Sequence, residues 1–364
     1  MPSLDSPTSR RSHTRRFLHV VASPYFRYKH AKFIHAIRVA LAMIASIALT
    51  TGVNIPHGVW ASVTLLVVIG GLQHHGNIRK KAAERALGTL LGAGLGLSLI
   101  IVQAVFGSLL LTFLLMSAIA GACAYYAIGK AGYVALLTAI TMVIVSGHGD
   151  LPFDVGLWRT ANVLIGIVIA LGFSFVLPQY ATYSWRYRLA DNLRECARLY
   201  SAILEGRPLD PEQVTRRFLV LSQRLVQSRS LMDSVAKEID VPVSMLEEIQ
   251  RLHRSILAAL EMMATSDAGS ARVLTADSSA EERAVRQTLL LMARALRFGR
   301  VGLLHAAAYE LEVKPGIDVA HPHADMQGMH WLAMRLAEQV NRLRLRLIEI
   351  ERHWNLEGAQ PFFR

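Results

Sequence analysis

Long apolar runs without charge occupy only the first half of the sequence, and this uneven distribution constrains the fold more than any other feature. Nearly all of these runs lie before Pro178, whereas residues 186–364 carry regularly spaced charges typical of amphipathic helices. A helix needs about 20 apolar residues to cross a bilayer, and the early runs approach that length. The pattern predicts an all-α protein with a membrane half and a soluble half.

Six apolar segments have the composition expected of membrane-spanning helices. They cover roughly residues 33–52, 58–73, 86–106, 108–128, 131–147 and 157–177. We therefore expect three parts: a basic cytoplasmic tail at 1–32, a six-span transmembrane domain at 33–178, and a cytoplasmic helical domain at 179–364.

Positive charge is concentrated in the first half of the chain. Of the net charge of +12, +10 falls within residues 1–178 and +2 beyond them. A nearly neutral soluble half argues against nucleic-acid binding, which requires a basic face. Lys and Arg gather before the first span, in the second connection and after the sixth span, whereas the first and third connections have none. The positive-inside rule then places both termini in the cytoplasm.

Three arginines lie within or beside the apolar segments: Arg38, Arg85 and Arg159. Each either extends to a lipid headgroup from near a span end or faces a polar path through the protein. In a path, the planar guanidinium would bind the carboxylate of an organic anion through two hydrogen bonds and would stay charged. Arg159 is the most informative, because the outer side otherwise lacks positive charge.

Trp60, Thr64 and Thr138 are the other residues that we expect along such a path. Trp60 is equally typical of an interfacial anchor, and threonine hydroxyls in a membrane often bond to their own helix. Their interpretation depends on an internal repeat. A shift of 74 residues places Gly58, Ala61, Thr64, Arg85, Gly92 and Gly96 on Gly132, Ala135, Thr138, Arg159, Gly166 and Ala170. Three spans per copy would give an inverted repeat, as in many transporters, with Thr64 and Thr138 as symmetry mates near the midplane.

Three glycines in the third apolar segment recur every four residues, at Gly88, Gly92 and Gly96. This spacing puts them on one helix face, where the absence of side chains allows a neighbouring helix to approach closely. We interpret these glycines as helix-packing residues rather than ligand contacts.

The sequence contains no recognisable catalytic, metal or cofactor constellation. Its two cysteines, Cys123 and Cys196, lie in different halves and cannot form a disulfide framework. The histidines of the second half show no paired metal-ligand spacing, and we interpret the HPHAD segment at 321–325 as a loop. No Asp or Glu lies deep in an apolar segment, so a channel or facilitated anion path fits at least as well as a carboxylate-driven pump. We expect no enzyme.

The second half predicts a helical bundle. We expect one helix from about Tyr180 to Glu205, others around Val243–Ser266 and Ser279–Leu311, and one that begins at Asp210-Pro211, a good N-cap and first-turn pair. The apolar stripe of the Asp210 helix continues through Val214, Phe218, Leu221, Leu225, Met232, Val235 and Ile239. A similar stripe in the last helix comprises Leu332, Leu336, Val340, Leu343, Leu347 and Ile350. Such stripes favour an intramolecular core.

Two motifs resemble those of a known family. The segment PHGVWASVT at residues 56–64 resembles the proline, tryptophan-alanine and threonine signature of fusaric-acid-resistance and aromatic-acid-exporter proteins. The segment RALGTLLG at residues 85–92 resembles the R-x-x-G-T-x-x-G element of the same family. The similarity that we identify covers about residues 30–180.

This resemblance implies a six-span transport protein of the bacterial inner membrane with a cytoplasmic helical domain, related in plan to plant aluminium-activated malate channels. It implies organic anions, and aromatic carboxylic acids above all, as the substrates for efflux. Many relatives contain the membrane-plus-soluble unit twice, so the single copy here predicts a homodimer. The alternative is a non-transporting membrane scaffold or sensor, whose helical bundle binds a partner.

Overall fold

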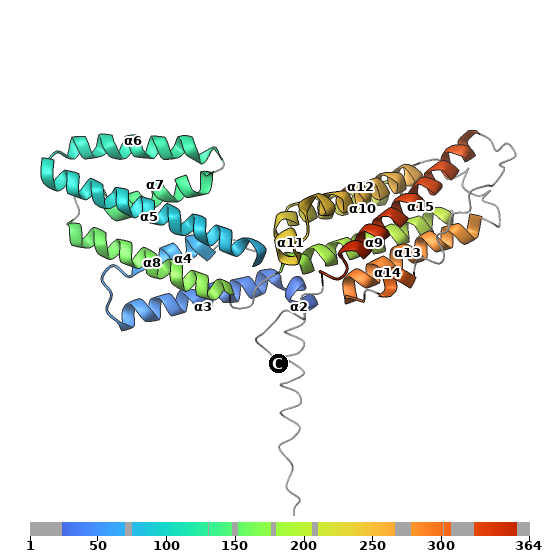
Figure 1. The fold of residues 1–364 in the computed structure, drawn as a ribbon, viewed down its shortest axis with the longest axis horizontal. Coiled ribbons are helices and arrows are strands. Elements are labelled where there is room, and N and C mark those ends of the chain that lie inside the picture. The colour runs from blue at the N-terminus through green and yellow to red at the C-terminus, as the bar shows by residue number, and fades with distance from the viewer. Residues whose placement is uncertain are drawn as a thin grey trace, which may run out of the picture. The chain divides into compact units, whose positions relative to one another are not determined.

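The chain folds into helices that form two compact units, Met1–Gln179 and Tyr180–Arg364 (Figure 1). The computed structural model describes residues 24–69, 75–129, 131–147, 152–175, 180–205, 210–265, 278–300, 302–306 and 324–354. Within these ranges there are helices and short connections but no β-strand, which confirms the all-α prediction. We refer to the two parts as the N-terminal and C-terminal units.

The N-terminal unit contains helices of very different length. They are α2 (Pro24–Lys29), α3 (Ala31–Gly52), α4 (Val59–Ile69), α5 (His75–Phe106), α6 (Leu109–Ala127), α7 (Gly132–Ser146) and α8 (Phe153–Phe175). Four of them are long and apolar enough to cross a membrane: α3, α5 over Ala83–Phe106, α6 and α8. The 11 residues of α4 and the 15 of α7 correspond to about 16 and 22 Å, less than a hydrocarbon core of about 30 Å.

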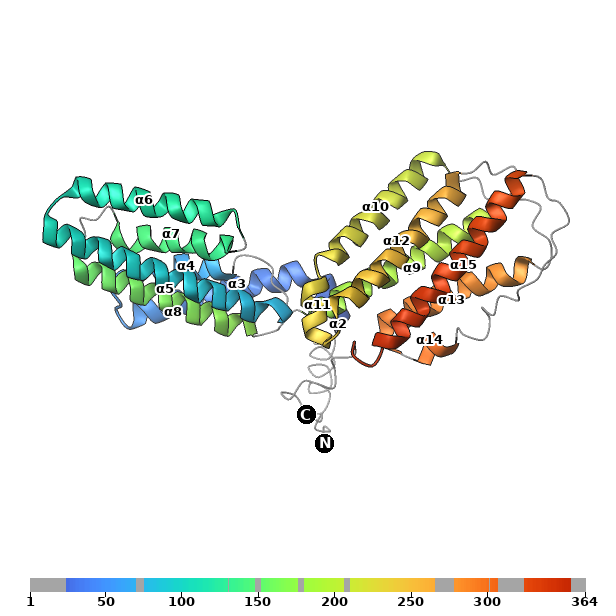
Figure 2. The same cartoon turned by 45° about the horizontal axis from the view of Figure 1, so that its top comes forward.

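The two shorter apolar helices, α4 and α7, are each paired with a long one. In both views α7 lies along α5 and α4 lies along α8, while α3 and α6 flank these pairs (Figure 1 and Figure 2). The inner surfaces bury Ala42, Leu65, Val163, Ile167 and Ala170 among others. By contrast, only 6% of the apolar stretch of α6 is buried within the chain. Most of the surface of α6 is therefore available to lipid or another protein.

The start of α5 differs from the prediction. We expected the third span to begin with Arg85 at its boundary, but the helix begins at His75 and continues through the basic connection. This connection consists largely of Lys, Arg, Ala and Glu, which are good helix formers. Arg85 therefore lies inside a continuous helix. Residues 24–29 of the predicted tail are also helical, as α2.

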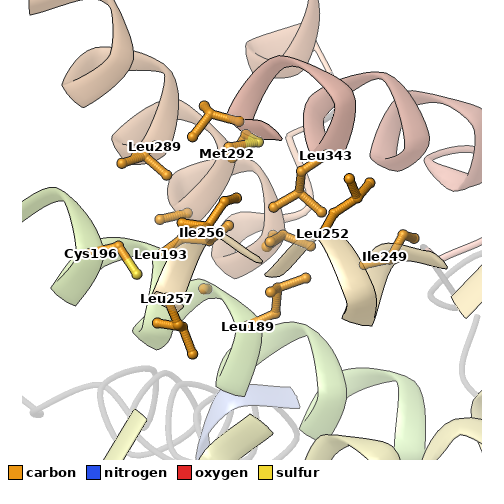
Figure 3. Packing of buried hydrophobic residues seen from close by; sticks show 14 of the residues in the cluster. Leu189, Leu193, Cys196, Ile249, Leu252, Ile256, Leu257, Leu289, Met292 and Leu343 are labelled. Carbon is orange, nitrogen blue, oxygen red and sulfur yellow. The ribbon is translucent and has the colours of Figure 1, made fainter. Parts of the chain in front are cut away.

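The C-terminal unit is a bundle of amphipathic helices. They are α9 (Ala181–Leu204), α10 (Pro211–Arg229), α11 (Met232–Ile239), α12 (Val243–Thr265), α13 (Ser278–Phe298), α14 (Gly302–Ala306) and α15 (Ala324–Ile350). Figure 3 shows the centre of its core, where Leu193 of α9, Ile256 of α12, Met292 of α13 and Leu343 of α15 come together. The stripe predicted for the last helix supplies five of its six members to the buried core, while Leu332 packs against it.

Two predicted helices of this unit are each divided in two. The Asp210 helix begins as expected, with the Asp210 carboxylate accepting a hydrogen bond from the Glu212 amide, but it stops at Arg229. Nearby, the hydroxyls of Ser228 and Ser230 bond to backbone carbonyls, which is an alternative to regular helix pairing. The helix predicted over 279–311 ends at Phe298, because Gly299 adopts a positive φ of 68°.

Arg186 follows the last predicted span, where the positive-inside rule suggested a cation at the membrane surface, but the structure buries it. Its side chain is buried in the C-terminal unit, where Nε donates to the Leu296 carbonyl and Nη1 to the Trp354 carbonyl. Its guanidinium also lies over the Trp354 ring. The cation thus joins the first helix of the unit to the ends of two others, where exposed carbonyls favour positive charge.

Candidate functional site

A narrow cavity lies between the two short helices of the N-terminal unit. Its polar lining consists of Thr64 from α4, Arg85 and Thr89 from α5, and Thr141 from α7. The apolar lining is Val63, Val67, Val68, Leu137, Ile140, Ile144 and Val163. The volume of about 20 Å³ suffices for a water molecule and is far too small for an aromatic acid. In this conformation the cavity therefore has no room for such a molecule.

Arg85 is one of two arginines associated with this cavity. Its side chain is only 7% exposed, its Nε donates a hydrogen bond to the Tyr133 hydroxyl, and its guanidinium carbon lies 5.4 Å from the centre of the Tyr133 ring. An aromatic face and a hydroxyl stabilise the cation without neutralising it. Arg85 therefore places its guanidinium beside a small cavity whose lining is mostly apolar.

Arg159 has a similar environment on α8. Its guanidinium carbon lies 5.4 Å from the centre of the Trp60 ring, and Nη1 donates to the Ile144 carbonyl at 2.8 Å. Ile144 itself lines the cavity. The Nε of Arg159 is buried and has no hydrogen-bond partner among the described residues, so a strong donor is left available. The structure thus brings together Arg159 and Trp60, two residues singled out from the sequence.

The two arginines contact α7 at well-separated points. Arg85 is held at Tyr133 and Arg159 at Ile144, which are 11 residues apart and hence about 16 Å apart along the helix. Thr64 and Thr141 line the cavity that Arg85 and Ile144 also border. Arg85 therefore borders the cavity directly, whereas Arg159 contacts the backbone of one residue that lines it.

Arg38 lies apart from this arrangement. It is buried on α3, where Nη2 donates to Nδ1 of His35 at 2.9 Å, and it does not line the cavity. Its Nε has no hydrogen-bond partner among the described residues. Arg38 therefore contacts His35 and lies apart from the two arginines associated with the cavity.

Thr138 and the three glycines lie where α5 and α7 meet. The Thr138 hydroxyl donates to the Gly88 carbonyl at 3.2 Å and to the Val134 carbonyl at 2.9 Å. A Cβ atom added to Gly92 would lie 2.5 Å from the Thr138 carbonyl oxygen, and one added to Gly88 or Gly96 would lie 2.8 Å or 2.9 Å from α7 atoms. The glycines allow the two backbones to touch, and in this conformation Thr138 belongs to that contact.

An equivalent contact joins α8 to α4. A Cβ atom at Gly166 would collide with the Ala61 carbonyl and would lie 3.0 Å from Cβ of Thr64. A shift of 74 residues places Gly92 on Gly166 and Thr64 on Thr138. The contact between Gly92 of α5 and Thr138 of α7 thus corresponds to the contact between Gly166 of α8 and Thr64 of α4. The arginine–aromatic contacts follow the same pattern. The 74-residue shift places Arg85 on Arg159, and it places Trp60 one position after Tyr133.

Two residues with evident roles were not singled out from the sequence. Tyr133 is the partner of Arg85, and the 74-residue shift of the sequence could have drawn attention to it, since it lies one residue from the position that this shift assigns to Trp60. Asn162 is fully buried on α8 and donates to the Pro56 carbonyl at 2.7 Å and the Trp158 carbonyl at 2.8 Å. The sequence signal for Asn162 was a polar amide side chain about one turn after Arg159 in an otherwise apolar segment.

Among the described residues there is no group of three or more His, Cys, Asp or Glu side chains that could hold a metal ion. The HPHAD segment, which was predicted to be a loop, lies mostly outside those residues, and its side chains are not described.

Comparison with known proteins gives the family. Residues 32–357 match the Fusaric acid resistance protein family. The chain belongs to this family. It is also 30% identical over 330 residues to the "Inner membrane protein YeeA" of Escherichia coli (strain K12), an alignment that covers 87% of this chain and 93% of that protein. The resemblance predicted from two motifs is confirmed, and the match extends well beyond residue 180, through most of the C-terminal unit.

Family membership has coarse consequences for function. With four helices suited to spanning a bilayer and an inner-membrane relative, the chain is a membrane protein, and an inner-membrane location is indicated. Members of this family are transport-type membrane proteins rather than enzymes. A transporter-like role follows at this level.

Proposed function

We propose that this protein moves organic anions, in particular aromatic carboxylates, out of the bacterial cytoplasm through the N-terminal unit. The observation that carries the proposal is a pair of arginines: Arg85 borders the cavity, and Arg159 donates to the carbonyl of Ile144, which lines it. Neither has a carboxylate partner among the described residues, and each is held by an aromatic ring and an uncharged oxygen. Arg85 is buried and Arg159 is partly buried. A cation that lacks a carboxylate partner and is shielded from water attracts an anion strongly, because the surroundings screen the charge poorly.

The aromatic partners favour a substrate with both a carboxylate and a ring. Guanidinium groups bind carboxylates through paired hydrogen bonds, while Trp60 and Tyr133 offer ring surfaces next to those groups. Displacing a guanidinium from its ring toward the substrate exchanges one favourable contact for another. Arg85 and Arg159 would bind the carboxylate in turn, and Thr64 would line the path between them. We also propose that Thr138 and Arg38 contact the substrate. Both would have to turn toward the path in another conformation, because here they bond to Gly88 and His35.

Because the cavity is too small for an aromatic acid, transport requires a second conformation. We propose that the N-terminal unit is a 3+3 inverted repeat, in which all six predicted segments belong to the membrane domain. The exchange of equivalent contacts between α5 with α7 and α8 with α4 supports this plan, and in such repeats alternating access arises when the two copies rearrange around a central site. The short helices α4 and α7 would flank that site, as interrupted helices do in many transporters.

We also propose a homodimer in the bilayer with both termini in the cytoplasm. Relatives with two copies of the unit motivate the dimer. The exposed surface of α6, on which Leu110, Leu114 and Tyr125 protrude, offers apolar area for a helix of a second copy. Lipid would cover whatever the partner does not.

Flux in proteoliposomes tests the transport proposal. Purified protein is reconstituted, and efflux of benzoate and substituted benzoates is followed with and without an imposed gradient. We expect flux in the wild type and at least a tenfold loss in Arg159→Ala and in Arg85→Ala. Arg159→Lys keeps the charge without the planar fork and should retain part of the activity.

Thr160→Ala is the matched control, because its hydroxyl bonds only to the Gly156 carbonyl of its own helix, and it should transport normally. Folded wild-type protein that moves no anion would disprove the proposal and favour the alternative, a scaffold or sensor that binds a partner. Unchanged flux in Arg159→Ala would remove that residue from the path.

A further inference from the structure

A second cavity, in the C-terminal unit, has the size of a ligand site. It lies between α9 and α13 and has a volume of about 360 Å³, within the range of about 300–1,000 Å³ for small-molecule sites. Its lining combines three arginines and one aspartate with apolar surface. The residues are Ala190, Asp191, Arg194, Leu290, Ala293, Arg294, Arg297 and Phe298. We call it the α9–α13 groove.

The charges in the α9–α13 groove follow from the register of the two helices. The helices run in opposite directions (Figure 1), and Arg297 forms an ion pair with Asp191 at 3.6 Å. One turn further along α9 comes Arg194, and one turn back along α13 comes Arg294. The same register that pairs Asp191 with Arg297 therefore sets Arg194 opposite Arg294, so that two like charges face each other.

Arg194 and Arg294 have no structural use that would explain this arrangement. Neither makes a hydrogen bond or ion pair with another described residue, although other surface arginines do, such as Arg198 with Glu195 and Arg216 with Glu212. Arg297 is accounted for by Asp191 and by its place in the last turn of α13, where a cation is favoured. Facing like charges repel each other, and an anion placed between them would convert repulsion into attraction.

Apolar surface lies directly beside these charges. Phe298, the last residue of α13, is 65% exposed, and the positive φ of Gly299 ends the helix immediately after it. Ala190, Leu290 and Ala293 add small apolar groups to the groove. A ligand that complements this surface has an anionic group for the arginines and a flat apolar body for Phe298.

We propose that the α9–α13 groove is a second binding site, specific for a small aromatic carboxylate and separate from the transport path. Its carboxylate binds between Arg194 and Arg294, and its ring packs on Phe298. The choice of an aromatic anion rests on the proposed function, because a protein that exports such compounds would gain from sensing their cytoplasmic concentration. The groove itself is observed independently of any transport activity.

Calorimetric titration of benzoate into the detergent-solubilised full-length protein tests this site. The variants are Arg194→Ala/Arg294→Ala, which removes the facing charges, and Arg216→Ala, which removes an exposed arginine from α10. Arg159→Ala is titrated in parallel, so that binding in the membrane cavity is distinguished from binding in the groove. Far-UV circular dichroism and gel filtration establish that each variant is folded, which the exposure of Arg194 and Arg294 favours.

We expect benzoate binding in the wild type, in Arg216→Ala and in Arg159→Ala, and at least tenfold weaker binding in the double variant. Phe298→Ala should weaken benzoate binding but leave weak sulfate binding unchanged. Sulfate that binds as tightly as benzoate would overturn the aromatic specificity. Absence of benzoate binding, or its loss in Arg159→Ala with retention in the double variant, would overturn the groove as the site. Groove binding without any flux would instead leave this site standing and disprove only the transport proposal.

Discussion

Acidification is expected to destabilise the C-terminal unit through one buried imidazole, that of His253 on α12. The side chain is 3% exposed, and burial lowers its pKa to about 4 from an ordinary value of about 6.5. Nδ2 of Asn192 also donates to the Leu221 carbonyl, which fixes that amide as a donor, so Nε2 of His253 accepts its hydrogen bond at 3.3 Å. Protonation of Nε2 would place two donors against each other.

The pKa difference sets the size and direction of the effect. Because the unfolded chain takes up the proton at higher pH than the folded protein, stability is full above about pH 6.5 and falls as the pH decreases toward 4. A shift of about 2.5 units at ~1.36 kcal/mol per unit corresponds to a loss of ~3 kcal/mol by pH 4, of which ~2 kcal/mol should appear by pH 5. This is a substantial part of the stability of an ordinary domain.

Urea unfolding between pH 7 and pH 4.5, followed by tryptophan fluorescence, measures the change. Trp185 and Trp354 are buried in this unit and report its unfolding. His253→Gln keeps a hydrogen-bond acceptor for Asn192 but cannot be protonated, so we expect a lower stability at pH 7 and a much shallower decline with acid. His353→Gln, at an exposed position, is the control. An acid-induced loss in His253→Gln as large as in the wild type would refute the assignment.

Two further predictions concern residues whose packing is defined by the structure. Gly92→Ala should destabilise the N-terminal unit by ~1–3 kcal/mol, because its new methyl group meets the Thr138 carbonyl at 2.5 Å; Gly94→Ala meets nothing within 4 Å and should be neutral or stabilising in thermal unfolding in detergent. Arg186→Leu should lower the free energy of unfolding of the C-terminal unit by ~2–4 kcal/mol, since two buried carbonyls lose a charged donor. An unfolding midpoint equal to that of the wild type in Gly92→Ala, or in Arg186→Leu, would contradict the prediction for that variant.

Much of the helical plan could be predicted from the sequence, since it depends on local periodicity and end signals. The helices α9 and α12 match their predicted ranges to within about a residue, and Asp210 caps α10 as its position before Pro211 indicated. The break after Arg229 was missed because the apolar stripe continues across it, from Val214 to Ile239. The break after Phe298 was missed as well, although Gly299 marks it. Apolar periodicity indicates which residues face the core, but it does not distinguish one long helix from two consecutive helices.

The candidate site could be predicted only in part. The sequence identified Arg85, Arg159, Trp60 and Thr64 one by one, by their chemistry and by an apparent repeat. It could not show that Arg159 lies over Trp60 or that Arg85 pairs with Tyr133, because these partners are 99 and 48 positions away along the chain. Nor could it separate Thr138, which lies in a helix contact, from Thr64, which lines the cavity.

The sequence by itself determined the helical class, the division into an apolar and an amphipathic half, and the glycine face of α5. These properties follow from composition and from spacing within a few residues. Only the tertiary structure decided that α4 and α7 are short, that a small cavity lies between them, and that Arg194 faces Arg294 across a groove. Each of these depends on the register between helices distant in the chain, and that register is set by how their side chains pack together.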